Sequence, residues 1–323
     1  MKDAKGREIK YLRVSVTDRC NLRCKYCMPN GIECVEHKDI LSFEEIRQIA
    51  VCGARLGITK IRLTGGEPLA RKGCPELIRM LKEIPGIEKI AMTTNGTLVR
   101  AILPELVEAG LDEINISLDT LDAGMFAAIT GQDLLPEVLL AIDAALAAGL
   151  KVKVNAVSMP DTDWKRLITL AKDKPVDVRF IELMPIGEGR HSEGRSNEEL
   201  LEEIRSEFPQ LQADGSVHGA GPAVYYRIPG YQGSIGLISA MHGKFCSSCN
   251  RVRLTSTGFL KTCLCYEDGT DLREILRGDH TEENRSGELL DAMARTIYGK
   301  PAEHCFEQPD QITEAHGMSA IGG

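Results

Sequence analysis

Apolar and polar residues alternate over several short segments of the chain. From Leu12 to Thr17 the sequence reads Leu-Arg-Val-Ser-Val-Thr, and the same alternation recurs over 60–64, 114–119 and 151–156. Neighbouring side chains of a strand point to opposite faces. Each segment therefore predicts a strand with one apolar face and one polar face.

Segments with helical patterns separate these strands. We expect strands over 11–17, 60–64, 89–95, 113–119, 151–157 and 177–184, and helices over 43–56, 76–83, 101–109, 137–148 and 164–172. Six β/α units with short connections predict a parallel sheet with right-handed crossovers. Because a closed barrel has eight units, we expect an α/β fold with an incomplete (β/α)6 TIM-type barrel.

The repeating pattern ends after Pro185. A glycine-rich, charged stretch follows, then a helical segment over 197–208 and turn-rich sequence with further cysteines. We therefore expect a barrel core over residues 1–185 and a C-terminal extension over residues 186–323.

The polar strand faces carry several cations. By strand parity they include Arg13, Lys60, Arg62, Lys151 and Lys153. One alternative is an antiparallel sheet with a solvated face, but the helices between the strands argue against it. A polar barrel interior predicts a binding cavity, and its cations indicate a polyanion such as a di- or triphosphate.

Overall charge and cysteine content narrow the class of protein. The chain of 323 residues has a formal net charge of −8, which disfavours general nucleic-acid binding. It shows no signal-peptide pattern and no apolar run of the length that a membrane span needs. An odd number of cysteines, eleven, cannot pair completely, and grouped cysteines favour metal binding. We expect a cytoplasmic protein without a membrane or nucleic-acid partner.

The first cysteine group has the spacing C-x3-C-x2-C. Cys20, Cys24 and Cys27 lie in the run Asp-Arg-Cys-Asn-Leu-Arg-Cys-Lys-Tyr-Cys-Met-Pro. Three thiolates can hold three irons of a 4Fe–4S cluster and leave the fourth iron open for chemistry. The alternatives are three unrelated thiols or part of a zinc site.

A second cysteine group lies in the extension. Cys246 and Cys249 have the spacing C-x2-C, and Cys263 and Cys265 follow. All four could bind zinc, or the first three could hold a second iron–sulfur cluster. The nearby Arg251 and Arg253 alternate on a strand-like run, so they could face the same anion or lie on a solvated face.

The strand ends add a glycine motif. Gly65-Gly66-Glu67-Pro68 follows the second strand, at the end of the barrel where catalytic residues gather. A cysteine loop after the first strand and this motif after the second resemble the radical S-adenosylmethionine (SAM) enzymes. The second cysteine run, Phe-Cys-Ser-Ser-Cys-Asn-Arg-Val-Arg-Leu-Thr, and the final Gly-Gly resemble the GTP 3′,8-cyclase family of molybdenum cofactor biosynthesis.

This resemblance implies two 4Fe–4S clusters, SAM as cofactor, and a role for each matching residue. The first cluster would be held by Cys20, Cys24 and Cys27, and the second, which binds the guanine of GTP, by Cys246, Cys249 and Cys263. The implied SAM contacts are Tyr26, Gly66, Ser117 and Met184. The implied GTP contacts are Arg13, Arg62, Thr93, Lys153, Arg251 and Arg253. Three residues are implied to act in catalysis: Arg179, Gly322 and Gly323.

The implied reaction starts with a 5′-deoxyadenosyl radical that removes hydrogen from C3′ of GTP. The C3′ radical attacks C8, and reduction and protonation give (8S)-3′,8-cyclo-7,8-dihydroguanosine 5′-triphosphate. The implied partners are a flavodoxin- or ferredoxin-type reductant, a cyclic pyranopterin monophosphate synthase that receives the product, and a second copy of the chain in a homodimer.

Two other functions fit parts of the sequence. A radical SAM enzyme that modifies a peptide could use the same cysteine groups, but the clustered cations favour a nucleotide. A zinc-binding interaction protein without enzymatic activity would need no polar barrel interior.

Overall fold

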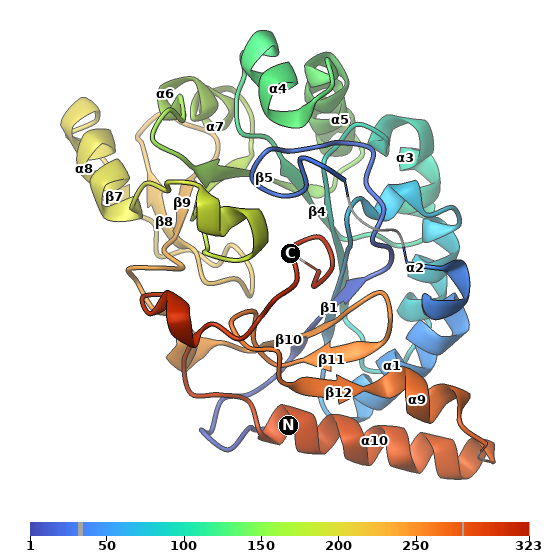
Figure 1. The fold of residues 1–323 in the computed structure, drawn as a ribbon. Coiled ribbons are helices and arrows are strands. Elements are labelled where there is room, and N and C mark those ends of the chain that lie inside the picture. Colours follow the sequence, from blue (N-terminus) through green and yellow to red (C-terminus); the bar gives the residue numbers. More distant parts are fainter. Residues whose placement is uncertain (32–34, 280, 323) are drawn as a thin grey trace.

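The predicted strands form the centre of the fold. The computed structural model describes residues 1–31, 35–279 and 281–322 (Figure 1). The six central strands are β1 (Tyr11–Ser15), β2 (Lys60–Thr64), β3 (Lys89–Thr94), β4 (Glu113–Ser117), β5 (Lys151–Ser158) and β6 (Asp177–Glu182). Each begins at the expected residue, and most end one or two residues earlier than expected.

These strands belong to one twelve-stranded sheet with the order β12-β11-β10-β1-β2-β3-β4-β5-β6-β9-β8-β7. Strands β1 to β6 are parallel to their neighbours, which confirms the predicted parallel sheet of an incomplete barrel. The extension continues the sheet at both edges, because β10 (Arg251–Leu254) pairs in parallel with β1 and β9 (Ile235–Ile238) with β6. The division at residue 185 stays a prediction, and the sheet runs across it.

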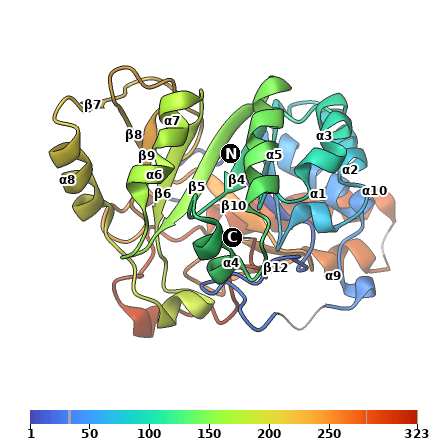
Figure 2. The same cartoon turned by 90° about the horizontal axis from the view of Figure 1, so that it is seen from above.

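Helices cover the outer face of the sheet (Figures 1 and 2). They are α1 (Phe43–Arg55), α2 (Cys74–Lys82), α3 (Val99–Glu108), α4 (Ala123–Thr130), α5 (Leu135–Ala147), α6 (Trp164–Leu167) and α7 (Thr169–Asp173). Helix α1 starts as its sequence predicts, since the Ser42 hydroxyl accepts from the N–H of Glu45 and the Glu45 carboxylate accepts from the N–H of Ser42. The expected helix over 164–172 is divided into α6 and α7, and α4 was not predicted.

The core lies between the apolar strand faces and these helices. Leu12, Val14, Ile61 and Leu63 are fully buried, in one cluster with the inner faces of the helices, such as Ile49 of α1. This confirms the predicted apolar face. The opposite face of the same strands is polar and points into the barrel.

The C-terminal extension contains more regular structure than the sequence indicated. Besides β9 and β10 it forms α8 (Asn197–Glu207), β7 (Gln212–Ala213), β8 (Val224–Arg227), β11 (Phe259–Lys261), β12 (Gly269–Asp271), α9 (Leu272–Arg277) and α10 (Glu282–Tyr298). Of these, α8 was predicted. The chain then returns to the barrel, and its end lies inside the curve of the sheet (Figure 1).

No single helix among the described residues is long and apolar enough to cross a membrane. One bent pair, α4 and α5, satisfies the length and composition together, with an angle of 101° between the two helices.

Candidate functional site

The barrel encloses a cavity of about 390 Å³. Its walls include the predicted residues Arg13, Cys20, Cys24, Tyr26, Cys27, Arg62, Gly66, Thr93, Ser117, Lys153, Arg179, Met184, Cys246, Cys249, Arg251, Arg253 and Cys263. The fold therefore brings both cysteine groups and the strand cations to one space. Gly323 lies outside the described residues.

The first cysteine group lies in the loop that follows β1. The N–H groups of Cys27 and Met28 both donate to the carbonyl of Cys24, at 3.0 and 2.9 Å, and bend the loop into a tight turn. Two N–H groups approach the sulfur of Cys20: the backbone of Leu22 at 3.4 Å and the side chain of Asn95 at 3.8 Å. Hydrogen bonds to sulfur are among the contacts that tune iron–sulfur clusters.

Burial and nearby acidic groups disfavour free thiolates in this loop, so the thiolates would need a bound cation to stabilise them. Burial, together with the nearby Cys20 thiol, raises the pKa of Cys27 to about 11. Burial also raises the pKa of Cys24, and the carboxylate of Asp119 raises it further. Three thiolates in this loop would repel one another unless positive metal ions lay between them. The residues present thus fit a 4Fe–4S cluster with an open iron.

The second cysteine group stands at the other end of the neighbouring strand. Cys246 and Cys249 belong to a short turn directly before β10, and Arg251 of β10 pairs with Tyr11 at the start of β1. The first group follows the end of β1. The two groups therefore lie at opposite ends of adjacent parallel strands, with the cavity between them.

Positive charge surrounds the second group. Although burial opposes the thiolate, Lys300 and Arg251 lower the pKa of Cys249. Burial raises the pKa of Cys246 and of Cys263. Thiols beside cations are readily held as thiolate ligands, so this group also fits an iron–sulfur cluster.

Cys265 does not complete this group. It is fully buried, and its sulfur lies 3.2 Å from the sulfur of Cys305. Among residues 1–31, 35–279 and 281–322, no three His, Cys, Asp or Glu side chains are arranged to hold a single metal ion. A four-iron cluster needs a wider arrangement, since each thiolate binds a different iron. The contact of Cys265 with Cys305 disfavours the four-cysteine zinc alternative.

The glycine motif after β2 requires glycine for steric reasons. A Cβ at Gly66 would lie 2.5 Å from the carbonyl oxygen of Arg19. The carboxylate of Glu67 accepts hydrogen bonds from the N–H groups of Leu69 and Asn95, at 3.0 and 2.7 Å, and burial raises its pKa to about 7. These contacts fix the backbone of the motif beside the cysteine loop.

Tyr26 is held by Asp119, which follows β4 by two residues. Its hydroxyl donates to a carboxylate oxygen of Asp119 at 2.7 Å, and the other oxygen of Asp119 accepts from the N–H of Val157 at 2.8 Å. Ser117 and Met184 line the same cavity. The four residues predicted to contact SAM therefore share one cavity with the first cysteine group.

The strand cations form the wall between the two cysteine groups. Arg13 pairs with Arg62 of β2 and with Arg253 of β10 in the register of the sheet. Burial lowers the pKa of Arg253, and the neighbouring Arg13 and Arg251 lower it further. Such crowding of like charges favours a bound polyanion.

One predicted cation does not belong to this wall. Lys151, the first residue of β5, is exposed and is not among the cavity residues. Lys60 does line the cavity, and its Nζ lies 2.5 Å from the carboxylate of Glu113. The expectation for Lys151 was therefore wrong and that for Lys60 correct.

The end of the chain lies against the strand cations. Gly322 has φ +72°, and a Cβ there would lie 3.2 Å from the hydroxyl of Thr64 and 3.3 Å from the Cβ of Ser15. Arg253 donates a hydrogen bond to the carbonyl of Gly322. Met318 and Ser319 of the same tail line the cavity. The tail is thus part of the cavity wall.

Sequence analysis missed several polar residues of the cavity. Tyr11 lines it among four cations, and although burial opposes ionisation, Arg62 and the other cations lower its pKa to about 8. Glu113 faces Lys60, and Asn155 accepts two hydrogen bonds from Arg179. Strand parity could have found all three, since Tyr11 shares a strand face with Arg13, Asn155 with Lys153, and Glu113 with Ser117.

Comparisons with known proteins agree with this geometry. Residues 14–173 match the radical SAM superfamily, and residues 176–306 match the family described as Molybdenum Cofactor Synthesis C. The chain is 44% identical to the GTP 3′,8-cyclase of Clostridium perfringens (strain 13 / Type A), over 100% of both chains. It is likewise 44% identical to the GTP 3′,8-cyclase of Moorella thermoacetica, again over 100% of both.

The chain belongs to the GTP 3′,8-cyclase family of radical SAM enzymes. This confirms the predicted enzyme class, the use of SAM and two 4Fe–4S clusters, and a place at the first step of molybdenum cofactor biosynthesis. Among solved structures, Streptococcus suis SuiB bound to S-adenosylmethionine has a TM-score of 0.65 at 15% identity, over 90% of this chain and 67% of that chain. That likeness confirms the fold.

Proposed function

We propose that this chain binds GTP across the cavity, with the guanine at the second cysteine group and the triphosphate among the strand cations. The observation that carries this proposal is the position of two three-cysteine groups at opposite ends of β1 and β10, with Arg13 paired to Arg253 between them. A nucleoside triphosphate has the matching form, since one end is a flat heterocycle and the other a polyanion.

Six residues are assigned to GTP. Arg13, Arg62, Lys153, Arg251 and Arg253 supply positive charge, and Thr93 supplies a hydroxyl beside Arg62, whose Nη1 lies 3.3 Å from it. Arginine suits this role because its planar donors match phosphate oxygens. Glu113 balances Lys60 and Arg62, so those cations keep fixed positions.

Four residues are assigned to SAM. Tyr26, Gly66, Ser117 and Met184 line the same cavity as the first cysteine group, and the amino acid end of SAM would bind at the open iron. Cys20, Cys24 and Cys27 would hold the first cluster, which would supply the electron for cleavage of SAM to the 5′-deoxyadenosyl radical. The chain's own contribution is to orient the two substrates and to exclude water.

Arg179, Gly322 and Gly323 are assigned to catalysis. Arg179 is anchored by Asn155, through Nε at 2.9 Å and Nη2 at 2.5 Å, and it faces the cavity. Gly322 contacts Arg253, so the tail holds a GTP-binding cation in place. We assign these residues to positioning the ribose for loss of the C3′ hydrogen.

The partners form a separate part of the proposal. A flavodoxin- or ferredoxin-type protein would supply electrons, and a cyclic pyranopterin monophosphate synthase would receive the triphosphate product. A homodimer and a cytoplasmic location belong to the same proposal. Free thiols in both cysteine groups favour a reducing compartment.

An anaerobic assay tests the proposal. Reconstituted protein with SAM and a chemical reductant should form 5′-deoxyadenosine only when GTP is added. Deuterium should appear in the 5′-deoxyadenosine from GTP labelled at C3′ and from no other ribose position. Formation without GTP would point to another substrate, such as a peptide.

A further inference from the structure

A loop of the C-terminal extension closes one side of the cavity, and the reaction described above assigns it no role. It connects β7 to β8, and β8 joins the sheet through β9, which pairs with β6. Four residues of this loop, Gly219, Ala220, Gly221 and Pro222, line the cavity together with Lys153 and Arg179. The first three of them are also exposed, so these four residues form an outer edge of the cavity, here called the rim.

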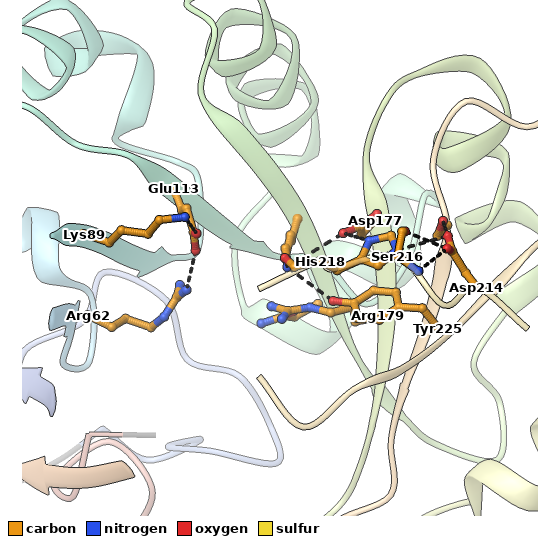
Figure 3. Close-up of polar contacts among 12 residues, drawn as sticks. Arg62, Lys89, Glu113, Asp177, Arg179, Asp214, Ser216, His218 and Tyr225 are labelled. Atoms are coloured by element: carbon orange, nitrogen blue, oxygen red, sulfur yellow. Dashed lines mark hydrogen bonds and ion pairs between the residues drawn. The ribbon is translucent and has the colours of Figure 1, made fainter. Parts of the chain in front are cut away.

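A histidine holds the rim to two strands (Figure 3). The Nδ1 of His218 lies 2.9 Å from a carboxylate oxygen of Asp177, and its Nε2 lies 3.0 Å from Asp214. The hydroxyl of Ser216 donates to the other oxygen of Asp214 at 2.6 Å. The imidazole also stacks on the ring of Tyr225, with centroids 3.8 Å apart and 13° between the planes. These contacts fix the residue from which the rim extends.

The same rim contacts a predicted phosphate ligand. The Nζ of Lys153 donates a hydrogen bond to the carbonyl of His218. It also lies 3.3 Å from the hydroxyl of Tyr225 and 3.7 Å from the carboxylate of Asp177. Arg179 is the next cation along this wall. The rim backbone and two cations of the cavity therefore belong to one connected set of polar groups.

The glycines of the rim face those cations. A Cβ added to Gly219 would lie 3.4 Å from the Nζ of Lys153, and one added to Gly221 would lie 3.9 Å from the Nη1 of Arg179. Gly219 also has φ +140°, a backbone conformation that residues with a side chain rarely adopt. Among the hydrogen bonds of the described residues, none is donated by the backbone N–H of residues 219–221. Glycine-rich backbone beside cations is typical of phosphate-binding loops.

We propose that residues 219–221 bind the terminal phosphates of the nucleotide through their backbone N–H groups, with His218 as the positioning residue. This rests on the proposed binding of GTP across the cavity. Because the rim would touch the phosphates farthest from the ribose, it determines phosphate-chain length: it favours a triphosphate over a monophosphate. The proposal adds a wall of backbone donors to the cations already assigned.

Two matched pairs of variants test the rim. Gly221→Ala places a methyl group toward Arg179, whereas Gly215→Ala, in the same loop, meets no atom within 4 Å. Ala220→Asp adds a negative charge to the cavity wall, whereas Val217→Asp adds it at a side chain that is 89% exposed and outside the wall. The second pair covers the case in which Gly221→Ala disturbs folding.

The readouts are the dissociation constants of GTP, GMP and inorganic tripolyphosphate, and the KM and kcat of GTP-dependent 5′-deoxyadenosine formation. The methyl group of Gly221→Ala would take up space between the rim and Arg179 where a phosphate would lie, and the carboxylate of Ala220→Asp would repel the phosphate. We therefore expect the affinity for GTP and tripolyphosphate to be about tenfold weaker in both variants. GMP affinity, kcat and iron content should stay near those of the parent protein, and both controls should behave like it.

Each result decides the proposal. The proposal is wrong if the rim variants lose affinity for GTP and GMP equally. It is also wrong if both rim variants bind GTP and tripolyphosphate as tightly as their controls. If the unaltered protein forms 5′-deoxyadenosine with GTP while the rim variants bind GTP and tripolyphosphate normally, phosphate binding by the rim is refuted and the proposed function stands. If the protein shows no GTP-dependent turnover but tripolyphosphate binding depends on residues 220 and 221, the proposed function is refuted and phosphate binding by the rim is supported.

Discussion

The Nη1 of Arg253 donates a hydrogen bond to the carbonyl oxygen of Gly322, so a cation of the cavity wall is tied to the end of the chain. Arg253 is buried and lies on β10, directly opposite Arg13 of β1. The tail thus reaches the middle of the wall rather than its rim. A change at the tail should therefore act on the position of the substrate.

We expect Gly322→Ala to lower kcat about tenfold or more. Its φ of +72° disfavours alanine by about 1 kcal/mol, and the added methyl would press on Thr64 and Ser15. Iron content and SAM binding should be unchanged, because neither cysteine group is touched. The measurement is the rate of 5′-deoxyadenosine formation at saturating GTP.

The matched control is Gly317→Ala in the same tail, where a Cβ meets no atom within 4 Å. It should keep the parental rate. Removal of Gly322 and Gly323 together should abolish turnover with both clusters intact. Undiminished turnover after that removal would show that the tail takes no part in the reaction.

Glu113 balances the cations at the start of the barrel strands. Its carboxylate lies 2.5 Å from Lys60 and 3.5 Å from Arg62, and its side chain is 4% exposed. Glu113→Gln should lower the free energy of unfolding by about 3 kcal/mol, since it leaves buried cations without their counter-charge. Added tripolyphosphate should restore more stability to this variant than to the parent protein, because the anion replaces the lost charge.

Thermal unfolding with and without tripolyphosphate measures both effects. Glu76→Gln is the control, because the Glu76–Arg79 pair is exposed and should contribute less than about 1 kcal/mol. A Glu113→Gln protein as stable as Glu76→Gln would mean that Lys60 and Arg62 need no counter-charge.

Two cysteines only two residues apart should differ in their effect on iron. Cys263 lines the cavity with Cys246 and Cys249, whereas the sulfur of Cys265 is buried against Cys305. We expect Cys263→Ser to lose about half of the bound iron and Cys265→Ser to keep all of it. Iron and zinc counts per chain, after identical anaerobic reconstitution, give the answer. Equal loss of metal from both variants would support the alternative in which all four cysteines bind one zinc ion.

Strand parity predicted most of the polar wall because a barrel strand has two distinct faces. It gave Arg13, Arg62 and Lys153, all of which line the cavity. It failed at Lys151, which has the right parity but is exposed as the first residue of β5, whereas Lys60, the first residue of β2, is buried and lines the cavity. Parity gives the face of a strand, and the surrounding chain decides whether a side chain on that face is enclosed.

The C-terminal extension was harder to predict for a physical reason. Strands such as β7, of two residues, and β11, of three, are too short to show a period. Their pairing depends on partners distant in sequence, as when β10 joins β1. The set of contacts around His218 likewise joins residues 177, 214 and 225, and no local pattern connects them.

Lys153 should make GTP binding depend on pH. Burial and the nearby Arg179 together lower the pKa of Lys153 to about 7, although Asp177 opposes this shift. A bound polyanion favours the ammonium form, so above about pH 7 binding must take up a proton. Affinity for GTP should therefore fall as the pH rises, by up to about tenfold per pH unit.

The range from about pH 7.5 to about pH 9 is the informative one, since a phosphate with a pKa near 6 is then fully ionised and ordinary imidazoles are neutral. Tyr11, with a pKa lowered to about 8, would add to the slope, so the measurement uses a Tyr11→Phe background. In that background Lys153→Arg should flatten the slope, because arginine stays charged throughout. If the slope of the dissociation constant is the same with lysine and arginine, Lys153 is charged before GTP binds.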